Sequence, residues 1–442
     1  MTRKVRVGLL GCGVVGTGIV RLLHDNARTI EGRLGAPIEI VGIAVRDLSK
    51  PRDAIVSAPL VTEDAMRVAT HPDVDVVVEV MGGLHPAGEL VKAALDLGKH
   101  VVTANKALLA EEGDALLETA EQKKVDLYFE AAVAGGIPII RVLREGLASD
   151  RIVALRGIVN GTSNYVLSRM QHEGLDFADV LKDAQRLGYA EADPTLDVGG
   201  GDAAHKLAIL ATLAYGARVH PREILKEGID TVGAVDMRYA ERFGFVIKPL
   251  AIARPVKWGR EEALDLRVHP ALVSKSSVLA SIGGALNAVF VEGAMLGPCL
   301  MSGPGAGALP TAMSVVSDIV DVGRNMLVDS HARVPTRAFR GESLQTMRVR
   351  PSAEHRCRWY LRFSVADQAG VLARIAGVLG GFDVSIEQMV QEGGRGGSSV
   401  PATLVMLTHE AREGDVREAL SEIARLAYCH EAPRALRVEE DA

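Results

Sequence analysis

The densest group of chemically capable side chains lies near the middle of the chain. The stretch 187–210, LGYAEADPTLDVGGGDAAHKLAIL, contains four acids and a lysine that can bind ligands or exchange protons: Glu191, Asp193, Asp197, Asp202 and Lys206. A helix beginning near Asp202 places that acid and Lys206 on one face, because they are four residues apart. One interpretation is a helix cap with an ordinary ion pair, worth only about 0.2–0.5 kcal/mol. The helix is apolar on both sides of Lys206, however, and a lysine beside an acid in such surroundings can be tuned for acid–base work.

A second lysine follows a short apolar segment earlier in the chain. His100–Thr103 is predicted to be a strand, and the TANK segment then ends in Lys106. Ligands of parallel sheets bind beyond the carboxyl ends of the strands, where Thr103 and Lys106 lie. Both are therefore candidates for cofactor contact, and Lys106 also for contact with an anionic substrate. A solvated surface lysine is the alternative.

A glycine turn near the N-terminus predicts a dinucleotide site. The GxGxxG spacing is formed by Gly11, Cys12, Gly13, Val14, Val15 and Gly16. The turn follows the apolar strand Val5–Leu10 and opens a predicted helix, Gly16–His24, which is the context that supports the motif. Glycines permit a tight turn and close approach of a pyrophosphate, which the amino end of the helix attracts. An incidental tight turn is the alternative.

The end of the next predicted strand bears on the choice of nucleotide. The strand Ile38–Val45 is followed by Arg46 and Asp47. A guanidinium group matches the geometry of a 2′-phosphate, so Arg46 favours NADP. Asp47 would instead serve the ribose hydroxyl of NAD. We expect NADP, with NAD as the alternative, and a solvated charge pair in a loop is the third interpretation.

The elements that must position these residues alternate between strand and helix up to about residue 130. Such β-α-β repetition predicts a parallel, doubly wound sheet of Rossmann type in an α/β chain. Residues 131–310 have a different pattern and are interpreted as an α+β catalytic and dimerisation domain. Within it, the polar segment 160–164 is expected to be a turn after a strand at 151–159. A helix at 311–330, after the glycine-rich loop 303–307, is expected to return to the first domain.

The last part of the chain has its own pattern. Residues 331–355 carry many Arg, Pro and Ser without periodicity and are interpreted as a linker. Residues 356–442 follow the order strand, helix, strand, strand, helix, strand, with a glycine-serine turn at 393–399. This βαββαβ order predicts a ferredoxin-like domain.

Composition excludes several classes of function. The net charge of −6 over 442 residues gives no electrostatic sign of nucleic-acid binding. No apolar run approaches the roughly 20 residues that span a bilayer, and the N-terminus lacks a signal-peptide cleavage site. The four cysteines form no CxxC pair and no zinc-spaced cluster, so reduced structural thiols are expected. We expect a cytoplasmic protein that binds neither nucleic acid nor membrane.

Taken together, the segments resemble the homoserine dehydrogenase family. The matching pieces, in the family's order over residues 1 to about 330, are GLLGCGVVGTG, VVVEVMGG, HVVTANKALLA, YFEAAVAGGIPII, GIVNGTSNYVL, LGYAEADPTLDVGGGDAAHKLAIL and GPGAGALPTAMSVVSDIV. The segments YAEADPT…D…DAAHK and AAVAGGIPI are specific to the family, whereas GxGxxG is not. Residues 357–442 resemble an ACT domain, with the turn Asp367–Gly370 before its first helix.

The resemblance implies reversible, NAD(P)-dependent interconversion of L-homoserine and L-aspartate 4-semialdehyde, in threonine and methionine biosynthesis. Lys206 matches the catalytic lysine and Lys106 the second active-site lysine. Glu191 and Asp202 match substrate-binding carboxylates, with Asp197 close by. The other matches are Gly161 and Thr162 in the substrate loop, Gly303 at the cofactor, and Glu130, Val133, Gly135 and Ile137 at a monovalent cation such as Na⁺, held mainly by backbone carbonyls.

The implied chemistry agrees with the residues, because a lysine at the substrate oxygen can take the hydroxyl proton when hydride leaves the alcohol carbon. One alternative is another ACT-tailed hydroxy-acid dehydrogenase, which typically needs an Arg/His pair. No histidine has a convincing acid partner in the sequence. His205 is next to Lys206 but points about 100° away from it on a helix. Aspartate-semialdehyde dehydrogenase would need a nucleophilic cysteine with a basic partner. A non-catalytic amino-acid sensor is the remaining alternative, against which the intact Lys206 argues.

The resemblance also implies an allosteric assembly. ACT domains suggest an amino-acid effector, and L-threonine, a downstream product, is the leading candidate. Asp367 and Gly370, at the start of a helix, offer a carboxylate and N–H groups to a zwitterion. A dimerisation domain without a ligand is the alternative. Sheets of both kinds associate in their families, so we expect a homodimer or homotetramer.

Overall fold

The computed structural model describes residues 3–393 and 401–440, which divide into two compact units. The first unit contains the chain up to residue 161 together with 202–224 and 286–347. The second contains 162–201, 225–285 and the chain from 348 onward. Among the described residues, no helix is both long and apolar enough to cross a membrane.

The first unit is built on a parallel sheet of six strands in the order β3-β2-β1-β4-β5-β6. The strands are β1 (Val5–Leu10), β2 (Ile38–Ala44), β3 (Val61–Thr62), β4 (Val76–Glu79), β5 (His100–Thr103) and β6 (Leu127–Tyr128). Every residue of β4 and β5 is buried, as expected for central strands covered on both faces. The predicted Rossmann-type fold is confirmed.

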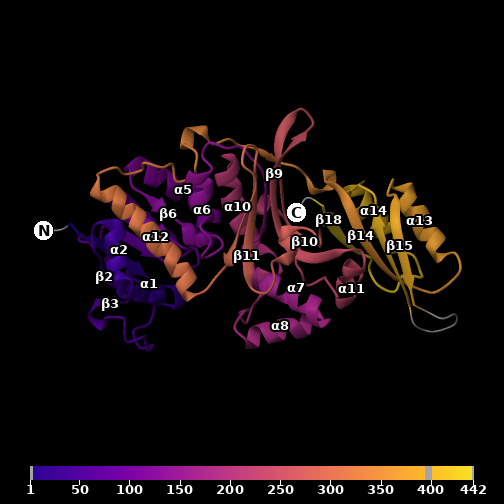
Figure 1. Ribbon diagram of the computed structural model, residues 1–442, viewed down its shortest axis with the longest axis horizontal. Coiled ribbons are helices and arrows are strands. Elements are labelled where there is room, and N and C mark those ends of the chain that lie inside the picture. The colour runs from indigo at the N-terminus through magenta and orange to yellow at the C-terminus, as the bar shows by residue number, and fades with distance from the viewer. Residues whose placement is uncertain (1–2, 394–400, 441–442) are drawn as a thin grey trace. The chain divides into compact units, whose positions relative to one another are not determined.

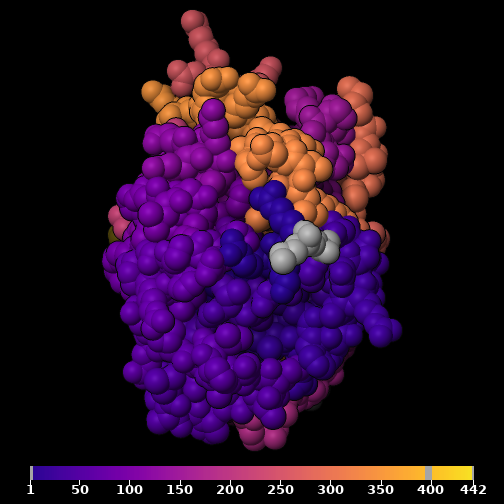
Figure 2. All heavy atoms as spheres, turned by 90° about the vertical axis from the view of Figure 1, so that its left-hand side faces the viewer, coloured from indigo at the N-terminus to yellow at the C-terminus, as the bar shows by residue number. Residues whose placement is uncertain are grey.

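Six helices accompany this sheet: α1 (Val14–Asp25), α2 (Ala27–Leu34), α3 (Ala65–Thr70), α4 (Ala87–Asp96), α5 (Lys106–Lys123) and α12 (Ala308–Leu327). Helix α12 comes from much later in the chain and packs beside α1 (Figure 1), where both contribute to one core with β1, β2 and β4. Figure 2 shows the surface at the left-hand side of Figure 1, where later residues, in orange, lie beside the indigo N-terminal segment. Arg3 donates a hydrogen bond of 2.8 Å to the carbonyl of Met326 at the end of α12.

The first unit also holds an antiparallel ribbon in the order β12-β11-β7 and two further helices. These elements are β7 (Ile152–Ile158), β11 (Leu286–Gly293), β12 (Gly297–Pro304), α6 (Ile139–Arg141) and α10 (Gly201–Tyr215). Strand β12 is not apparent in the sequence, because its residues alternate between exposed and half-buried along an edge. Helix α10 is buried along most of its length, as the apolar surroundings of Lys206 indicate.

The second unit begins with the helices α7 (Gly161–Glu173), α8 (Phe177–Arg186), α9 (Thr195–Val198) and α11 (Ala234–Arg242) and the strands β8 (Leu225–Lys226), β9 (Phe245–Trp258) and β10 (Glu261–Ser274). The sequence predicted a polar turn at 160–164, which is wrong, since α7 already begins at Gly161. Polar residues of this kind favour turns by local propensity. Here the Asn164 amide donates to the carbonyl of Ile282, and the Ser163 hydroxyl donates to that of Asp197, so the tertiary partners favour a helix.

The C-terminal domain consists of β13 (Arg348–Val349), β14 (Arg356–Val365), α13 (Val371–Gly381), β15 (Ile386–Glu392), β16 (Ala402–Thr408), β17 (Ala411–Arg412), α14 (Glu413–Ile423) and β18 (Arg434–Glu439). Its main sheet has the order β18-β14-β16-β15, with α13 and α14 on one face. The predicted ferredoxin-like fold is confirmed, and the predicted turn at 393–399 lies outside the described residues except for Gly393.

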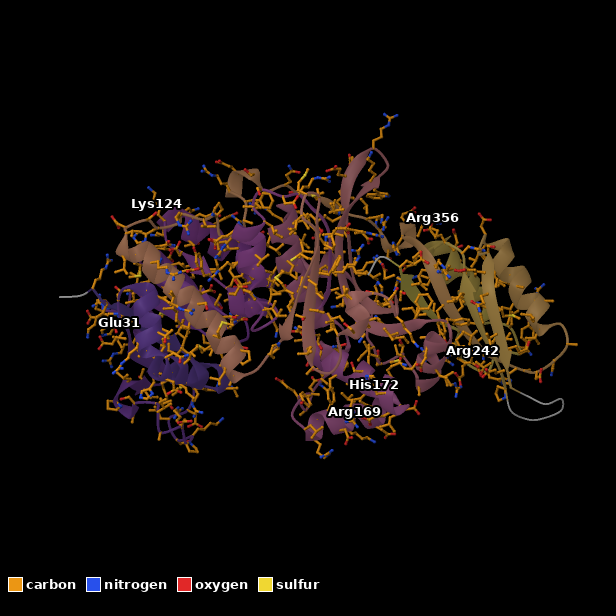
Figure 3. The ribbon with its side chains drawn as sticks, in the orientation of Figure 1. Glu31, Lys124, Arg169, His172, Arg242 and Arg356 are labelled. Carbon is orange, nitrogen blue, oxygen red and sulfur yellow. The ribbon has the colours of Figure 1, made fainter. Side chains whose placement is uncertain are left out.

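The other face of this sheet packs against α7 and α11, which belong to the same unit. Tyr360 and Leu436 belong to the same core as Val166 of α7 and Met237 of α11. Arg242, labelled in Figure 3, lies in the last turn of α11 and forms an ion pair with Glu392 of β15. In addition, β18 pairs in parallel with β10. The C-terminal domain is therefore joined to α7, α11 and β10 by a common core and a common sheet.

Candidate active site

The first unit brings together three of the residues singled out in the sequence. The carboxylate of Asp202 binds the ammonium groups of two lysines, Lys206 at 2.7 Å through Oδ2 and Lys106 at 2.8 Å through Oδ1. Lys206 also donates to the backbone carbonyl of Val159 at 2.7 Å. The amide of Asn160 donates to Asp202 at 2.8 Å. The predicted pair on the α10 face is therefore the centre of a larger buried cluster.

Burial and charge act in opposite directions on Asp202, whose relative exposure is only 2%. Burial alone would raise the pKa of this carboxyl group, but the positive charges of Lys206 and Lys106 outweigh it and hold the pKa well below its usual range. The first turn of α10 also favours a negative charge at this point. Asp202 is therefore a permanent carboxylate that fixes both lysines.

The two lysines differ in their access to solvent. The side chain of Lys206 is 9% exposed, whereas that of Lys106 is 38% exposed. Lys206 is thus held from several sides, and Lys106 reaches the surface of its unit while it remains bonded to Asp202.

The position of Lys106 depends on a hydrogen-bond network that the sequence analysis missed. Glu79, fully buried at the end of β4, accepts a hydrogen bond of 2.6 Å from the hydroxyl of Thr103 at the end of β5. The same hydroxyl accepts from the backbone N–H of Asn105, and the Asn105 side chain caps α5 by accepting from Leu108. Lys106 is the first residue of that helix. A glutamate within the apolar segment VVVEV was the signal for this network.

The glycine turn has the shape that a dinucleotide requires. Gly11 has a φ of +102°, and a Cβ atom there would lie 2.9 Å from the carbonyl oxygen of Val80. A Cβ at Gly16 would lie 2.2 Å from the carbonyl oxygen of Gly11. A Cβ at Gly13, in contrast, would meet no atom within 4 Å. The turn is therefore closed toward the sheet and open at Gly13, beside a hollow of about 370 Å³ that Val14 also lines.

The residues after β2 have distinct environments. Asp47 accepts hydrogen bonds from the N–H and hydroxyl of Ser49, which lower the pKa of its carboxyl group. The exposed Arg46 guanidinium makes no hydrogen bond or ion pair with any described residue. The acid is thus engaged in its own loop, whereas the arginine is available to a ligand.

The second unit carries the remaining acids of the central segment. Glu191 is exposed and Asp197 is half-buried in α9. Thr162 donates its hydroxyl to the carbonyl of Tyr189 at 2.7 Å, and Tyr189 stacks on Tyr165 with ring centroids 4.4 Å apart. These contacts hold the chain between α8 and α9 against the start of α7.

The segment of the expected cation site is compact and carries a buried acid. The Glu130 carboxylate accepts N–H groups of Ile140 and Arg141 at 2.8 and 2.9 Å. Burial, together with the neighbouring Asp318, raises the pKa of Glu130 to about 7. Val133, Gly135 and Ile137 follow in a buried or half-buried loop, in which the Gly135 carbonyl accepts the Ser314 hydroxyl at 2.7 Å. The N–H of Gly136 in this loop donates to the carbonyl of Pro304, the residue after Gly303, at 3.1 Å.

Two expectations about competing chemistries can be compared with the geometry. Burial raises the pKa of the Cys12 thiol and raises that of Cys357 to about 12, so neither is an activated nucleophile. The expectation that His205 has no acid partner is wrong, because α5 places the Glu111 carboxylate 3.7 Å from its Nε2 atom. This pair is separate from the Asp202 pairs and involves the neighbouring face of α10.

The turn before α13 is open to solvent. Gly370 is the N-cap of this helix, with a φ of +91°, and a Cβ there would meet nothing within 4 Å. Asp367 is exposed at the beginning of the same turn.

A Rossmann-type sheet with an open glycine turn and a buried Lys–Asp–Lys cluster defines a nicotinamide-dependent oxidoreductase. Comparison with known families agrees. Residues 138–320 match the homoserine dehydrogenase model, residues 11–130 its NAD-binding domain and residues 359–428 the ACT domain.

Similar proteins share almost the whole length of the chain. Homoserine dehydrogenases of Neisseria gonorrhoeae and Synechocystis are each 45% identical, over 98% of this chain and 97% and 99% of theirs. The crystal structure of a homoserine dehydrogenase from Thiobacillus denitrificans is 44% identical, covers 99% of both chains and has a TM-score of 0.92. The chain belongs to the homoserine dehydrogenase family. It is an oxidoreductase that interconverts L-homoserine and L-aspartate 4-semialdehyde with a nicotinamide cofactor.

The buried acids predict a pH-dependent effect of the substitution Asp318→Asn. The raised pKa of Glu130 means that the folded protein keeps a proton that the unfolded chain has lost between about pH 4.5 and 7. Glu130 therefore lowers stability as pH rises through this window, and so does Asp318, because burial raises the pKa of its own carboxyl group to about 6. Asp318→Asn removes the second charge and relieves both losses in part. Urea unfolding should show Asp318→Asn gaining about 1–2 kcal/mol relative to the parent between pH 5 and pH 8. The exposed Asp329→Asn serves as the control, and an equal difference at both pH values would contradict the account.

Proposed function

We propose that Lys206 is the proton acceptor during homoserine oxidation and the proton donor in the reverse direction. The observation that carries this assignment is the single buried carboxylate of Asp202, bonded to both Lys206 and Lys106. The single negative charge of Asp202 balances only one of the two lysine ammonium groups. One of the two lysines can therefore lose a proton at a smaller electrostatic cost. The nicotinamide, when bound, supplies the hydride acceptor. The hydroxyl proton of homoserine passes to the Lys206 amine, which Asp202 and the Val159 carbonyl hold in place.

Lys106 and the acids of the central segment are proposed to bind substrate. The ammonium of Lys106 suits the substrate carboxylate or the reacting oxygen, and its partial exposure supports this role. Glu191 and Asp197 would bind the substrate ammonium group, with Gly161 and Thr162 forming the adjoining loop. The family resemblance supports these positions, as does the availability of the Glu191 carboxylate at the surface of its unit.

The first test is the substitution Lys206→Ala. Loss of a general acid–base group typically lowers the rate by about 10²–10⁴-fold, and kcat for homoserine oxidation should fall by that factor. NADPH binding, followed by fluorescence, should stay within about twofold, because the glycine turn is untouched. The matched control is Lys92→Ala, which removes an exposed lysine of α4. A Lys206→Ala enzyme that keeps more than half of the parent kcat would rule out the assignment.

For the cofactor, we propose NADP, bound at Gly11–Gly16 with Thr103 and Gly303 as further contacts. The unengaged Arg46 guanidinium supports the choice, because it matches a 2′-phosphate. A hyperthermophilic archaeal homoserine dehydrogenase has been solved in complex with NADPH and is 27% identical, with a TM-score of 0.61 over 72% of this chain and 98% of that one.

The substitution Arg46→Ala tests this preference. Loss of a charge-assisted contact with phosphate should raise KM for NADP⁺ by at least about tenfold. KM for NAD⁺ should change by less than about twofold, since that cofactor lacks the 2′-phosphate. The exposed Arg28→Ala controls for the general loss of positive charge. Equal changes for the two cofactors would show that Arg46 does not bind the 2′-phosphate.

The proposal includes a monovalent cation such as Na⁺ beside Glu130, with the carbonyls of Val133, Gly135 and Ile137. The raised pKa of Glu130 supports it, because burial and Asp318 outweigh the nearby Arg141 charge, and a cation would stabilise the carboxylate that they disfavour. The cation would supply charge compensation for the loop and no redox chemistry.

We further propose a cytoplasmic homodimer or homotetramer. The unpaired state of the four cysteines agrees with a reducing compartment. At the turn between β11 and β12, Met295 is 87% exposed and Leu296 is 54% exposed. Apolar side chains clustered at an exposed hairpin are suited to contact with another subunit.

L-threonine is proposed as the effector, bound at the turn Asp367–Gly370. The open backbone at Gly370 and the free surface around it support a zwitterion there, with the Asp367 carboxylate facing its ammonium group. The expected coupling between effector and substrate is about 1–3 kcal/mol.

The full-length variant Asp367→Ala tests the effector site. Threonine should inhibit the parent enzyme, and the inhibition constant should rise at least about tenfold in the variant, while activity without threonine stays unchanged. Glu410→Gln, an exposed acid elsewhere in the C-terminal domain, should retain the parent response. A parent enzyme that binds no threonine by calorimetry would leave this domain a structural one.

A further inference from the structure

A glycine-rich loop without side chains of its own leads from α9 to the catalytic helix. Gly199 and Gly200 follow α9, and Gly201 is the first residue of α10. Gly200 has a φ of +82°, which a residue with a side chain rarely adopts. Glycines cannot anchor a loop by packing, so the position of this loop depends on the backbone that lies against it.

That neighbouring backbone is the segment after β8. The N–H of Ile229 donates to the carbonyl of Val198, the last residue of α9, at 2.9 Å. A Cβ atom at Gly228 would lie 2.9 Å from the same carbonyl oxygen. A Cβ at Gly200 would lie 3.1 Å from the Val268 side chain of β10 and 3.5 Å from the carbonyl oxygen of Glu227. Residues 227–229, together with the Val268 side chain, therefore form the surface on which the loop rests.

The segment is held by its backbone, in which the N–H of Glu227 donates to the carbonyl of Val268 at 2.8 Å, and by the side chain of Glu227. Its two carboxylate oxygens accept a forked pair of hydrogen bonds from the Arg437 guanidinium, at 2.7 and 2.8 Å, and Arg417 adds a contact of 3.1 Å. Burial would raise the pKa of the Glu227 carboxyl group, but the hydrogen bond and charge of Arg437 hold it below its ordinary value. A two-pronged pair of this kind fixes orientation as well as distance.

Arg437 lies on β18 of the C-terminal domain and is only 2% exposed. Its remaining N–H groups bind Glu413, at the start of α14, at 2.7 and 2.9 Å. The guanidinium also stacks near the Trp359 ring, 5.1 Å from its centroid. The C-terminal domain therefore fixes the position of Arg437, and Arg437 in turn fixes the carboxylate of Glu227.

We propose that Glu227 is a positioning residue for substrate binding, which joins the loop after α9 to Arg437 of the C-terminal domain. This positioning role rests on the proposed function, in which Asp197 of α9 and Glu191 bind the substrate ammonium. Glu227 touches no reacting atom. It fixes the end of α9 through Gly228 and Ile229, so the arrangement of β18 and α14 determines how well the acids meet the substrate.

The substitution Glu227→Gln tests the proposal, because it keeps the shape and removes the charge. Glu227 is 36% exposed at its side chain, so the variant is expected to fold. KM for homoserine should rise about tenfold, within the usual range of coupling between linked sites, while kcat stays within about twofold. KM for the nicotinamide cofactor should not change. A general loss of stability would not raise KM for homoserine alone.

Two further variants make the outcome specific. Glu261→Gln removes another ion pair of the second unit, with Arg348 at 3.3 Å, and should leave both KM values unchanged. Gly228→Ala keeps the Glu227–Arg437 pair but pushes on the Val198 carbonyl, and should raise KM for homoserine as Glu227→Gln does.

Glu191→Gln separates this proposal from the assignment of the substrate acids. A raised KM in Glu191→Gln with an unchanged KM in Glu227→Gln would overturn the positioning role and leave the substrate acids in place. An unchanged KM in both variants would overturn both. A raised KM in Glu191→Gln, Glu227→Gln and Gly228→Ala, with a normal Glu261→Gln enzyme, is the expected result.

Discussion

The burial of one negative charge constrains the architecture of the catalytic unit. A carboxylate as buried as that of Asp202 can stay ionised only if cations and hydrogen-bond donors replace the lost water. Removing one partner from such a group typically costs about 3–5 kcal/mol. The two lysines and the Asn160 amide supply the replacement from α5, α10 and the end of β7. These three elements must therefore converge on one point, whatever else the unit does.

The rest of the first unit can be understood as support for that convergence. The end of β5 is tied to β4 by Thr103 and Glu79, and this tie sets where α5 begins. The glycine turn lies at the same carboxyl edge of the sheet, where parallel strands present their ligands. The dinucleotide turn and the lysine at the start of α5 thus follow from a single sheet topology, and the cluster at Asp202 adds the group that exchanges the proton.

Local patterns in the sequence predicted the elements and one half of the cluster. The four-residue spacing of Asp202 and Lys206 places both on one helix face, and the apolar neighbours indicate burial. Nothing local links Lys106 or Asn160 to that helix, because their pairing depends on how distant segments pack. The same limit explains the polar segment at 160–164, where tertiary hydrogen bonds favour a helix over the expected turn. It also explains why the linker and ferredoxin-like pattern gave no sign that the C-terminal sheet shares a core with α7 and α11.

The most direct test of the central claim is the ionisation of Asp202 itself. Carbon-13 NMR of protein labelled at aspartate carboxyl groups, with the resonance assigned by its loss in Asp202→Asn, reports this group alone. We expect the Asp202 resonance to stay at the position of a carboxylate from pH 8 down to pH 4, because both lysines stabilise the charge. Titration of that resonance at or above the ordinary aspartate pKa of about 3.9 would contradict the account.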